Sequence, residues 1–179
     1  MVDKLTVLTT AGISASNLRD FSQAIGKSLT PALVVTWCVV DSQRMGQNRI
    51  ECQEAGAFKL IWLSPPRSMS QMKALLFGLK VLAERHYFTN PVVVMDPDMA
   101  SNVPDVLRFF DVLRQGNDLV FAWRRQRHGI SAFRRYLTGL YNRLAATVLK
   151  VHLHDLNAPM FMMSPYVLGR LIQDGQFSS

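Results

Sequence analysis

Short apolar runs alternate along the chain with segments of helical periodicity. The apolar runs have strand length, and their nearly continuous Val, Ile and Leu content is typical of strands buried on both faces. The intervening segments repeat apolar residues every three or four positions. This alternation predicts an α/β fold with a mostly parallel sheet flanked by helices. The predicted strands are residues 5–10, 32–41, 58–63, 91–96 and 118–123.

Three helical segments are predicted between these strands. The first has an apolar face behind a serine cap, the second repeats apolar residues at helical spacing, and the third lies between a proline and a glycine. They comprise a helix around Leu18, Phe21 and Ile25 with Ser14 or Ser16 as its cap, a helix over residues 69–85, and a helix from near Pro104 to Gly116.

Three further segments complete the pattern. Residues 42–56 have few apolar positions, which predicts a loop with a short helix. Residues 130–150 combine an apolar stripe with arginines outside the stripe, which indicates an amphipathic basic helix. Residues 151–165 predict a loop followed by a short helix. A methionine cluster in that segment is most simply core, although an isoprenoid ligand would also need such an adaptable apolar surface; it comprises Met160, Met162 and Met163.

The size and the apolar runs limit the class of protein. The chain has 179 residues, which fits one domain with a hydrophobic core. Its longest apolar run, residues 31–40, is much shorter than the roughly 20 residues that span a bilayer, and the N-terminus lacks a secretory signal pattern. We therefore expect a cytoplasmic chain that does not cross a membrane. Cys38 and Cys52 have neither metal nor disulfide spacing and are interpreted as buried thiols.

The formal net charge of +7 is concentrated in the second half of the chain. Between Arg108 and Lys150, only Asp111 and Asp118 oppose the basic side chains. One interpretation is a surface for phosphate, nucleic acid or acidic lipid, including peripheral contact with the cytoplasmic face of a membrane; the other is a solvated basic face. No nucleic-acid-binding motif accompanies the arginines, so nucleic acid ranks below the other partners.

Two carboxylates follow the predicted strand 91–96 at the point where the chain leaves the core. Ligands of open α/β sheets bind beyond the carboxyl ends of the strands. Asp96 and Asp98, separated by Pro97, can both reach one hard cation such as Mg²⁺ or Mn²⁺. Such a cation can bridge to a diphosphate and neutralise charge as a phosphate leaves. The position after a buried strand supports this interpretation more than the common Asp-x-Asp spacing does.

In its wider context, this motif resembles the family 2 glycosyltransferases of GT-A fold, and most closely the polyprenol-phosphate glycosyltransferases. The resemblance covers most of the chain. It implies a Rossmann-like nucleotide-diphospho-sugar transferase fold, with a nucleotide-sugar-binding half at residues 1–100 and an acceptor-binding half at residues 101–179. The matching stretches are 73-KALLFGLKVLAE-84, Asp96-Pro97-Asp98 after VVVM, 101-SNVPDVLRFFDVLRQGNDLVFAWR-124, 134-RRYLTGLYN-142 and 155-DLNAPMF-161.

The resemblance also implies a reaction and a set of site residues. A sugar would move, with inversion, from a UDP- or GDP-sugar to a polyprenyl phosphate. Asp155 would orient the acceptor or act as a base. The implied residues are Asp96 and Asp98 for the metal, Thr9, Asp41, Lys73 and Asp96 for the nucleotide donor, Arg124, Arg134 and Thr138 for the acceptor phosphate, and Asp155 and Asp96 for catalysis.

Several positions depart from the family pattern. The first strand ends in 9-TTAGISAS-16 instead of Pro-x-Tyr-Asn-Glu, the second ends in 41-DSQ-43 instead of paired acids, and Ala100 and Met160 replace a glutamine and a glycine. The alternative to an active transferase is therefore an inactive GT-A homologue that binds a partner, a membrane surface or nucleic acid. A zinc site at His152 and His154 is disfavoured, because no third ligand follows at a recognised spacing.

Overall fold

The computed structural model describes residues 3–11, 15–41, 49–84, 89–96, 98, 102–122 and 160–173. The chain divides into two compact units, Met1–Val120 with Met160–Ser179 and Phe121–Pro159. Only residues 121 and 122 of the second unit are described, so the predicted helix over residues 130–150 lies outside the described residues. No helix within the described ranges is both long enough and apolar enough to cross a bilayer.

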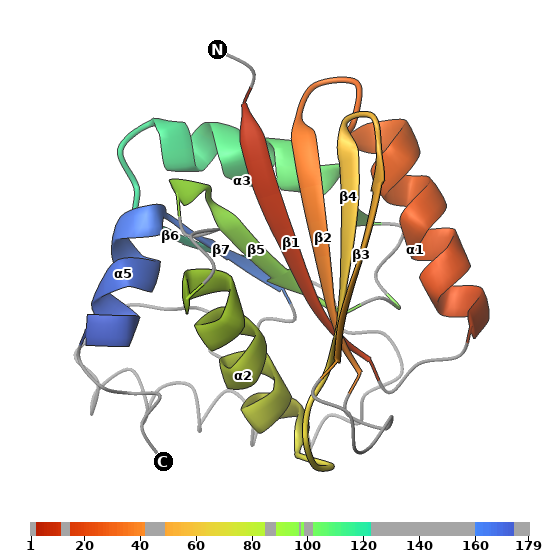
Figure 1. Cartoon of the computed structure of the whole chain (residues 1–179). Coiled ribbons are helices and arrows are strands. Elements are labelled where there is room, and N and C mark those ends of the chain that lie inside the picture. The colour runs from red at the N-terminus through yellow and green to blue at the C-terminus, as the bar shows by residue number, and fades with distance from the viewer. Residues whose placement is uncertain are drawn as a thin grey trace, which may run out of the picture. The chain divides into compact units, whose positions relative to one another are not determined.

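The described part of the chain is an α/β structure with a seven-stranded sheet in the order β3-β4-β2-β1-β5-β7-β6 (Figure 1). The strands are β1 (Lys4–Ala11), β2 (Val34–Asp41), β3 (Arg49–Ala55), β4 (Phe58–Ser64), β5 (Val92–Met95), β6 (Leu119–Phe121) and β7 (Met160–Met163). The helices are α1 (Ala15–Ser28), α2 (Gln71–Glu84), α3 (Asp105–Arg114) and α5 (Pro165–Gln173).

The sheet is mixed. Strands β4, β2, β1 and β5 are parallel to one another, whereas β3 is antiparallel to β4 and β7 is antiparallel to β5. The five predicted strands are confirmed as β1, β2, β4, β5 and β6, with ends shifted by a few residues. The two antiparallel strands are the ones that the hydrophobic pattern did not predict.

The prediction of a loop and short helix over residues 42–56 is wrong for residues 49–55, which form β3. This strand is the last strand at one edge of the sheet, and residues 51–55 are exposed. An edge strand with solvent on both sides needs no alternating apolar residues, so the strand signal is absent from the sequence. A two-residue turn joins β3 to β4, and Gly56 in that turn has a φ of 60°, which favours glycine.

The prediction of a loop over residues 151–165 is wrong for residues 160–163, which form β7. The three methionines in this strand are at most 3% exposed, so their interpretation as core is confirmed. The short helix that was expected after them is confirmed as α5. Three of the four residues of β7 are methionines, which lack the β-branching that favours strands, so the strand signal is weak.

The other helices follow the sequence pattern closely. Phe21 and Ile25 of α1 are fully buried, but Ser16 falls inside α1 and therefore does not precede the helix as a cap. The helix predicted from Pro104 to Gly116 is confirmed as α3, which Pro104 precedes. Gly116 beyond its end has a φ of 94°, a conformation that favours glycine at a helix terminus.

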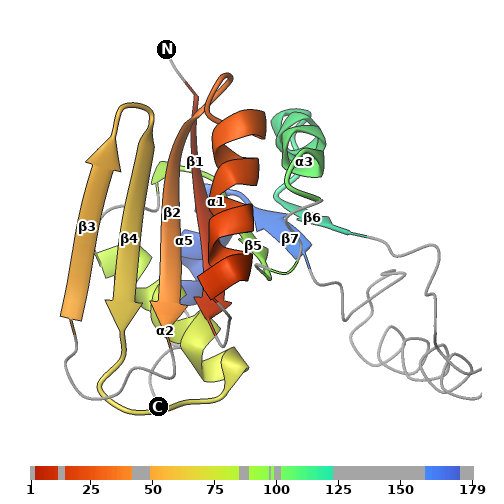
Figure 2. The ribbon, with the colours of Figure 1, turned by 90° about the vertical axis from the view of Figure 1, so that its right-hand side faces the viewer.

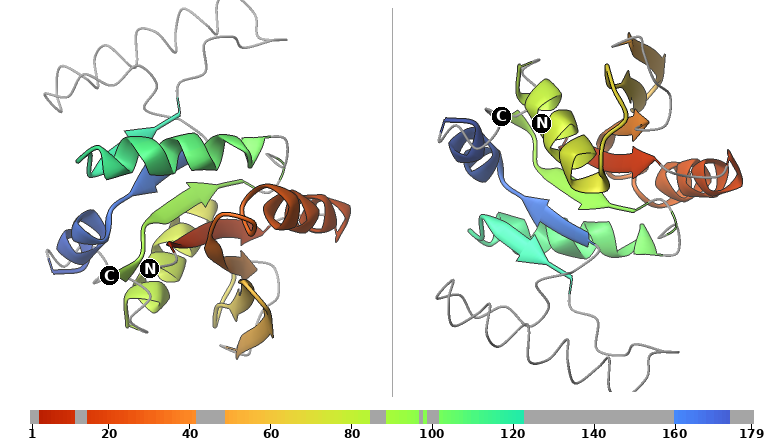
Figure 3. Two further views of the ribbon diagram at one scale, coloured as in Figure 1. Left: turned by 90° about the horizontal axis from the view of Figure 1, so that it is seen from above. Right: turned by 90° about the horizontal axis from the view of Figure 1, so that it is seen from below.

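The direction of the chain explains which helix covers which face. The chain passes from β1 to β2 through α1, and it passes from β4 to β5 through α2 in the opposite direction across the sheet. Because such crossovers are right-handed, α1 and α2 lie on opposite faces. The ribbon shows α1 and α3 on one face and α2 and α5 on the other (Figure 2 and Figure 3). The direction in which the chain adds strands to the sheet thus reverses between β1 and β5.

The two faces have different cores. On the α1 face, the rings of Phe21 and Trp37 pack with centroids 5.2 Å apart. On the α2 face, Gly78 lets the helix approach the sheet closely. A Cβ atom at Gly78 would lie 2.7 Å from Val40 Cγ2 and 2.8 Å from Leu8 Cδ1.

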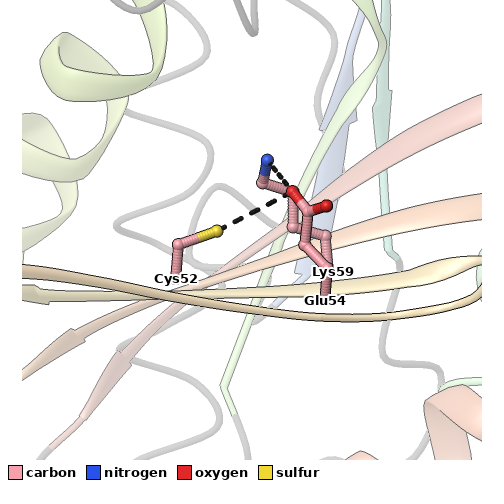
Figure 4. Close-up of polar contacts among 3 residues, drawn as sticks. All are labelled: Cys52, Glu54 and Lys59. Atoms are coloured by element: carbon pink, nitrogen blue, oxygen red, sulfur yellow. Dashed lines mark hydrogen bonds and ion pairs between the residues drawn. The ribbon is translucent and has the colours of Figure 1, made fainter.

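The two cysteines lie in different environments. Cys38 of β2 is buried, and its burial raises the pKa of the thiol. Cys52 is exposed on β3, so its interpretation as a buried thiol is wrong, because β3 is an edge strand. Its Sγ lies 3.9 Å from Glu54 Oε1, and Glu54 forms an ion pair with Lys59 of β4 (Figure 4).

Candidate functional site

The candidate site lies at the carboxyl edge of the parallel strands, where the sheet changes direction. Asp96 directly follows β5 and lies two residues beyond Val94, which pairs with Leu8 of β1. The chain moves to β2 on one side of β1 and reaches β5 on the other. Open α/β sheets bind ligands in the crevice that this reversal opens outside the strand ends. The topology therefore places Asp96 at the position where a ligand of this sheet is expected.

The negative charge of Asp98 acts on the neighbouring carboxylate of Asp96. Asp96 is half-buried and Asp98 is exposed. Burial and the negative charge of Asp98 raise the pKa of Asp96, whereas a hydrogen bond from Gln71 lowers it. Within the described ranges, no lysine or arginine side chain forms an ion pair with either aspartate. The pair is therefore a local concentration of negative charge that protein cations in those ranges do not neutralise.

This carboxylate pair fits a divalent cation. Mg²⁺ binds carboxylate oxygens and commonly uses only one or two protein carboxylates, with water and phosphate oxygens as its remaining ligands. The described residues contain no group of three or more His, Cys, Asp or Glu side chains arranged to hold a metal. Asp96 and Asp98 thus suit a cation that shares its coordination with a phosphate, and they do not form an all-protein metal cage.

The first turn of α2 lies beside the aspartates. Gln71, the first residue of the helix, donates a hydrogen bond from Nε2 to Asp96 Oδ1 at 3.0 Å. Ser70 precedes the helix, and its Oγ accepts a hydrogen bond from the Lys73 backbone N–H at 3.4 Å, as in an N-cap. The amino end of a helix carries partial positive charge. Negative side chains and a positive helix end therefore meet at this edge.

The predicted donor residues are distributed around this edge. Lys73 is exposed in the first turn of α2, two residues after Gln71. Asp41 is the last residue of β2, is 8% exposed and pairs in register with Ala11 of β1. Because β1 separates β2 from β5, Asp41 and Asp96 lie two strand spacings apart, about 10 Å. Strand alternation places Asp41 on the face that Trp37 shares with α1.

The side chain of Thr9 lies in the core. It is 1% exposed, and its hydroxyl accepts a hydrogen bond from Trp37 Nε1 at 3.0 Å. The structure therefore does not bring the Thr9 hydroxyl together with Asp96 and Asp98 at the carboxyl edge. The predicted acceptor and catalytic residues Arg124, Arg134, Thr138 and Asp155 lie outside the described residues.

Sequence reasoning did not select Ser70 or Gln71. A serine before a leucine-rich helical pattern is a recognised capping signal, so Ser70 could have been found. The contact between Gln71 and Asp96 could not be read from spacing, because it joins residues of two elements that meet only after α2 crosses the sheet.

The strand reversal, the aspartate pair and the first turn of α2 define the candidate site. Each is a property of this chain, observed in its own fold. Neither a protein-family model nor a curated protein matches the sequence.

Proposed function

We propose that this chain is a metal-assisted, inverting glycosyltransferase with a GT-A, Rossmann-like fold and a predominantly parallel nucleotide-binding sheet. It transfers a sugar from a UDP- or GDP-sugar to a polyprenyl phosphate or a similar acceptor. The observation that carries the proposal is the position of Asp96 and Asp98 at the carboxyl edge, beside the reversal between β1 and β5. A sheet of this kind binds its ligand there.

The charges at this edge suit a cation together with a diphosphate. Asp96 and Asp98 would hold Mg²⁺ or Mn²⁺, which supplies charge neutralisation for the donor diphosphate. Lys73 and the amino end of α2 offer positive charge to phosphate oxygens at the same edge. A site for a bare cation would gain nothing from this neighbouring positive charge. A cation and a phosphate together would use the negative aspartates as well as the positive Lys73 and helix end.

The spacing of the donor residues suits an extended ligand. Asp41 and Asp96 lie on either side of the end of β1. A nucleoside diphosphate can place its base or ribose near Asp41 and its phosphates near Asp96, and so cross the end of β1. In this proposal, β2 would select the nucleotide, and β5 and α2 would bind the phosphates.

The acceptor side of the proposal comes from the sequence. Arg124, Arg134 and Thr138 would bind the acceptor phosphate, because the arginine guanidinium matches phosphate oxygens. Asp155 would orient the acceptor or take up a proton. Holding donor and acceptor next to each other removes much of the entropic cost of reaction.

A titration with UDP- and GDP-sugars tests the proposal. Isothermal titration calorimetry on the whole chain, with and without Mn²⁺, should show metal-dependent binding of one nucleotide class. The double variant Asp96→Asn/Asp98→Asn should lose this binding and keep the melting temperature of the wild type. Asp111→Asn is the control, because it makes the same change on an exposed side chain of α3.

Two outcomes would contradict the proposal. Metal-dependent binding that persists in the double variant would remove the aspartates from the site. If the wild type binds neither nucleotide class but retains binding to anionic vesicles, the inactive binding module replaces the transferase.

A further inference from the structure

We infer that Gln71 is a positioning residue of the cation site, whose side-chain amide fixes the Asp96 carboxylate through one oxygen and leaves the other for a cation shared with Asp98. The inference deepens the proposed function and rests on it, because it concerns the same pair of aspartates. It adds a residue that comes from a different element and from outside the Asp-x-Asp motif.

The contact between the two side chains is direct. Gln71 Nε2 lies 3.0 Å from Asp96 Oδ1, a normal length for an N–H···O hydrogen bond. Among the described residues, Gln71 is the side chain that donates a hydrogen bond to Asp96. The terminal torsion of an aspartate is broad, so a carboxylate without a partner samples many orientations. The amide removes this freedom for a side chain that follows the end of β5.

The helix that carries Gln71 is itself held firmly. The Ser70 hydroxyl caps its first turn, and Ala74 in the next turn is fully buried. Further along, the backbone at Gly78 packs directly against the side chains of Leu8 and Val40. The amide therefore projects from an element whose position relative to β1 and β2 is fixed by core contacts.

Partners of this kind commonly set the strength of a metal site. Carboxylates that bind metals are themselves hydrogen-bonded, and loss of such a partner typically weakens metal affinity by about 10- to 100-fold. The neighbours of Gln71 on the helix do not share this role. Met72 is 64% exposed and its side chain has no hydrogen-bond donor, and among the described residues the Lys73 ammonium forms no ion pair with Asp96.

The test measures Mn²⁺ affinity directly on the whole chain by electron paramagnetic resonance, with no nucleotide present. Gln71→Met keeps the length of the side chain and removes the amide. We expect its dissociation constant for Mn²⁺ to rise by about 10- to 100-fold while its melting temperature stays that of the wild type. Gln71→Ala is a second variant and should behave in the same way.

A matched control is available on the opposite part of the sheet. Gln53 is an exposed glutamine of β3, and three strands separate β3 from β5. Gln53→Met makes the same chemical change, so its Mn²⁺ affinity should equal that of the wild type. An equal loss in this control would mean that removal of a surface amide acts in a general way, and it would overturn the inference.

The possible results separate the inference from the proposed function. Wild-type affinity in both Gln71 variants would overturn the inference and leave the aspartate site intact. Weaker Mn²⁺ binding in those variants, in a chain that binds no nucleotide sugar, would support the inference and refute the transferase. A wild type that binds no Mn²⁺ would overturn the inference, and nucleotide titration without metal would then judge the transferase separately.

Discussion

The indole Nε1 of Trp37 and the hydroxyl of Thr9 form a 3.0 Å hydrogen bond inside the sheet, between the adjacent strands β2 and β1. Thr9 is 1% exposed and Trp37 is 3% exposed, so water does not replace either partner. A buried indole N–H usually has such a partner. The relationship assigns Thr9 to the core, whereas the family resemblance implies a contact with the nucleotide donor.

Thr9→Val tests this assignment. Valine keeps the shape of threonine and leaves the Trp37 N–H without an acceptor, so the free energy of unfolding should fall by about 1–3 kcal/mol. Urea unfolding measures this loss. Donor affinity, measured under conditions where the variant is folded, should stay that of the wild type. A stable variant with weakened donor binding would instead place the hydroxyl of Thr9 in the nucleotide site.

Gly78→Ala should destabilise the fold. The added methyl would lie under 3 Å from Val40 Cγ2 and Leu8 Cδ1, and both side chains are buried. Overpacking of this kind costs about 1–3 kcal/mol. Gly26→Ala in α1 is the control, because no atom lies within 4 Å of the added Cβ. There the change should stabilise the protein by roughly 0.5–1 kcal/mol, as alanine favours a helix. Equal effects in the two variants would show that α2 is not in tight contact at Gly78.

The β3–β4 hairpin should contribute a dependence on pH. The hydrogen bond from Lys59, and then its positive charge, lower the pKa of Glu54 in the fold. A lowered folded pKa means that the unfolded chain binds more protons, so the stabilisation is present at neutral pH and is lost as pH falls through the folded pKa. The stability difference between wild type and Glu54→Gln should therefore disappear in acid. An NMR titration of Glu54 with a midpoint at or above the usual glutamate value would contradict the prediction.

The two thiols should react at very different rates. Cys52 is exposed, whereas Cys38 is buried and burial raises the pKa of its thiol. The thiolate is the reactive species, so Cys38 is protected both by inaccessibility and by protonation. Mass spectrometry after brief alkylation of the native chain should find one label, on Cys52, and two labels after unfolding in guanidinium. Rapid labelling of Cys38 in the native chain would show that the sheet opens near β2.

Arg134→Ala separates acceptor binding from donor binding. If Arg134 binds the acceptor phosphate, transfer to a short isoprenyl phosphate should fall below detection while donor affinity is unchanged, because a ligand of the acceptor phosphate would contribute nothing to nucleotide binding. A radiolabelled sugar donor measures the transfer. Transfer at the wild-type rate would remove Arg134 from the acceptor site.

The strands and helices that were predicted correctly are those whose buried positions appear as a regular pattern of apolar residues in the sequence. β2 and β5 have continuous apolar residues because helices cover both faces, and α1 has a clear apolar face. β3 was not predicted, because an exposed edge strand does not need alternating apolar and polar residues. The position of Asp96 could be inferred because it follows a buried strand, but its contact with Gln71 depends on how α2 crosses the sheet. No residue pattern within α2 or β5 alone indicates that Gln71 and Asp96 are in contact.

The pairing of β7 with β5 has a consequence for synthesis of the protein. Val92 and Val93 pair with Met163 and Met162, which the ribosome adds only after the whole of the second unit has been made. Until then, β5, the strand that leads into the aspartates, has one edge without a partner in the sheet order. A nascent chain with such an open apolar edge is prone to associate with other chains. Translation speed and chaperone binding through this interval should therefore decide how much of the protein reaches its native sheet.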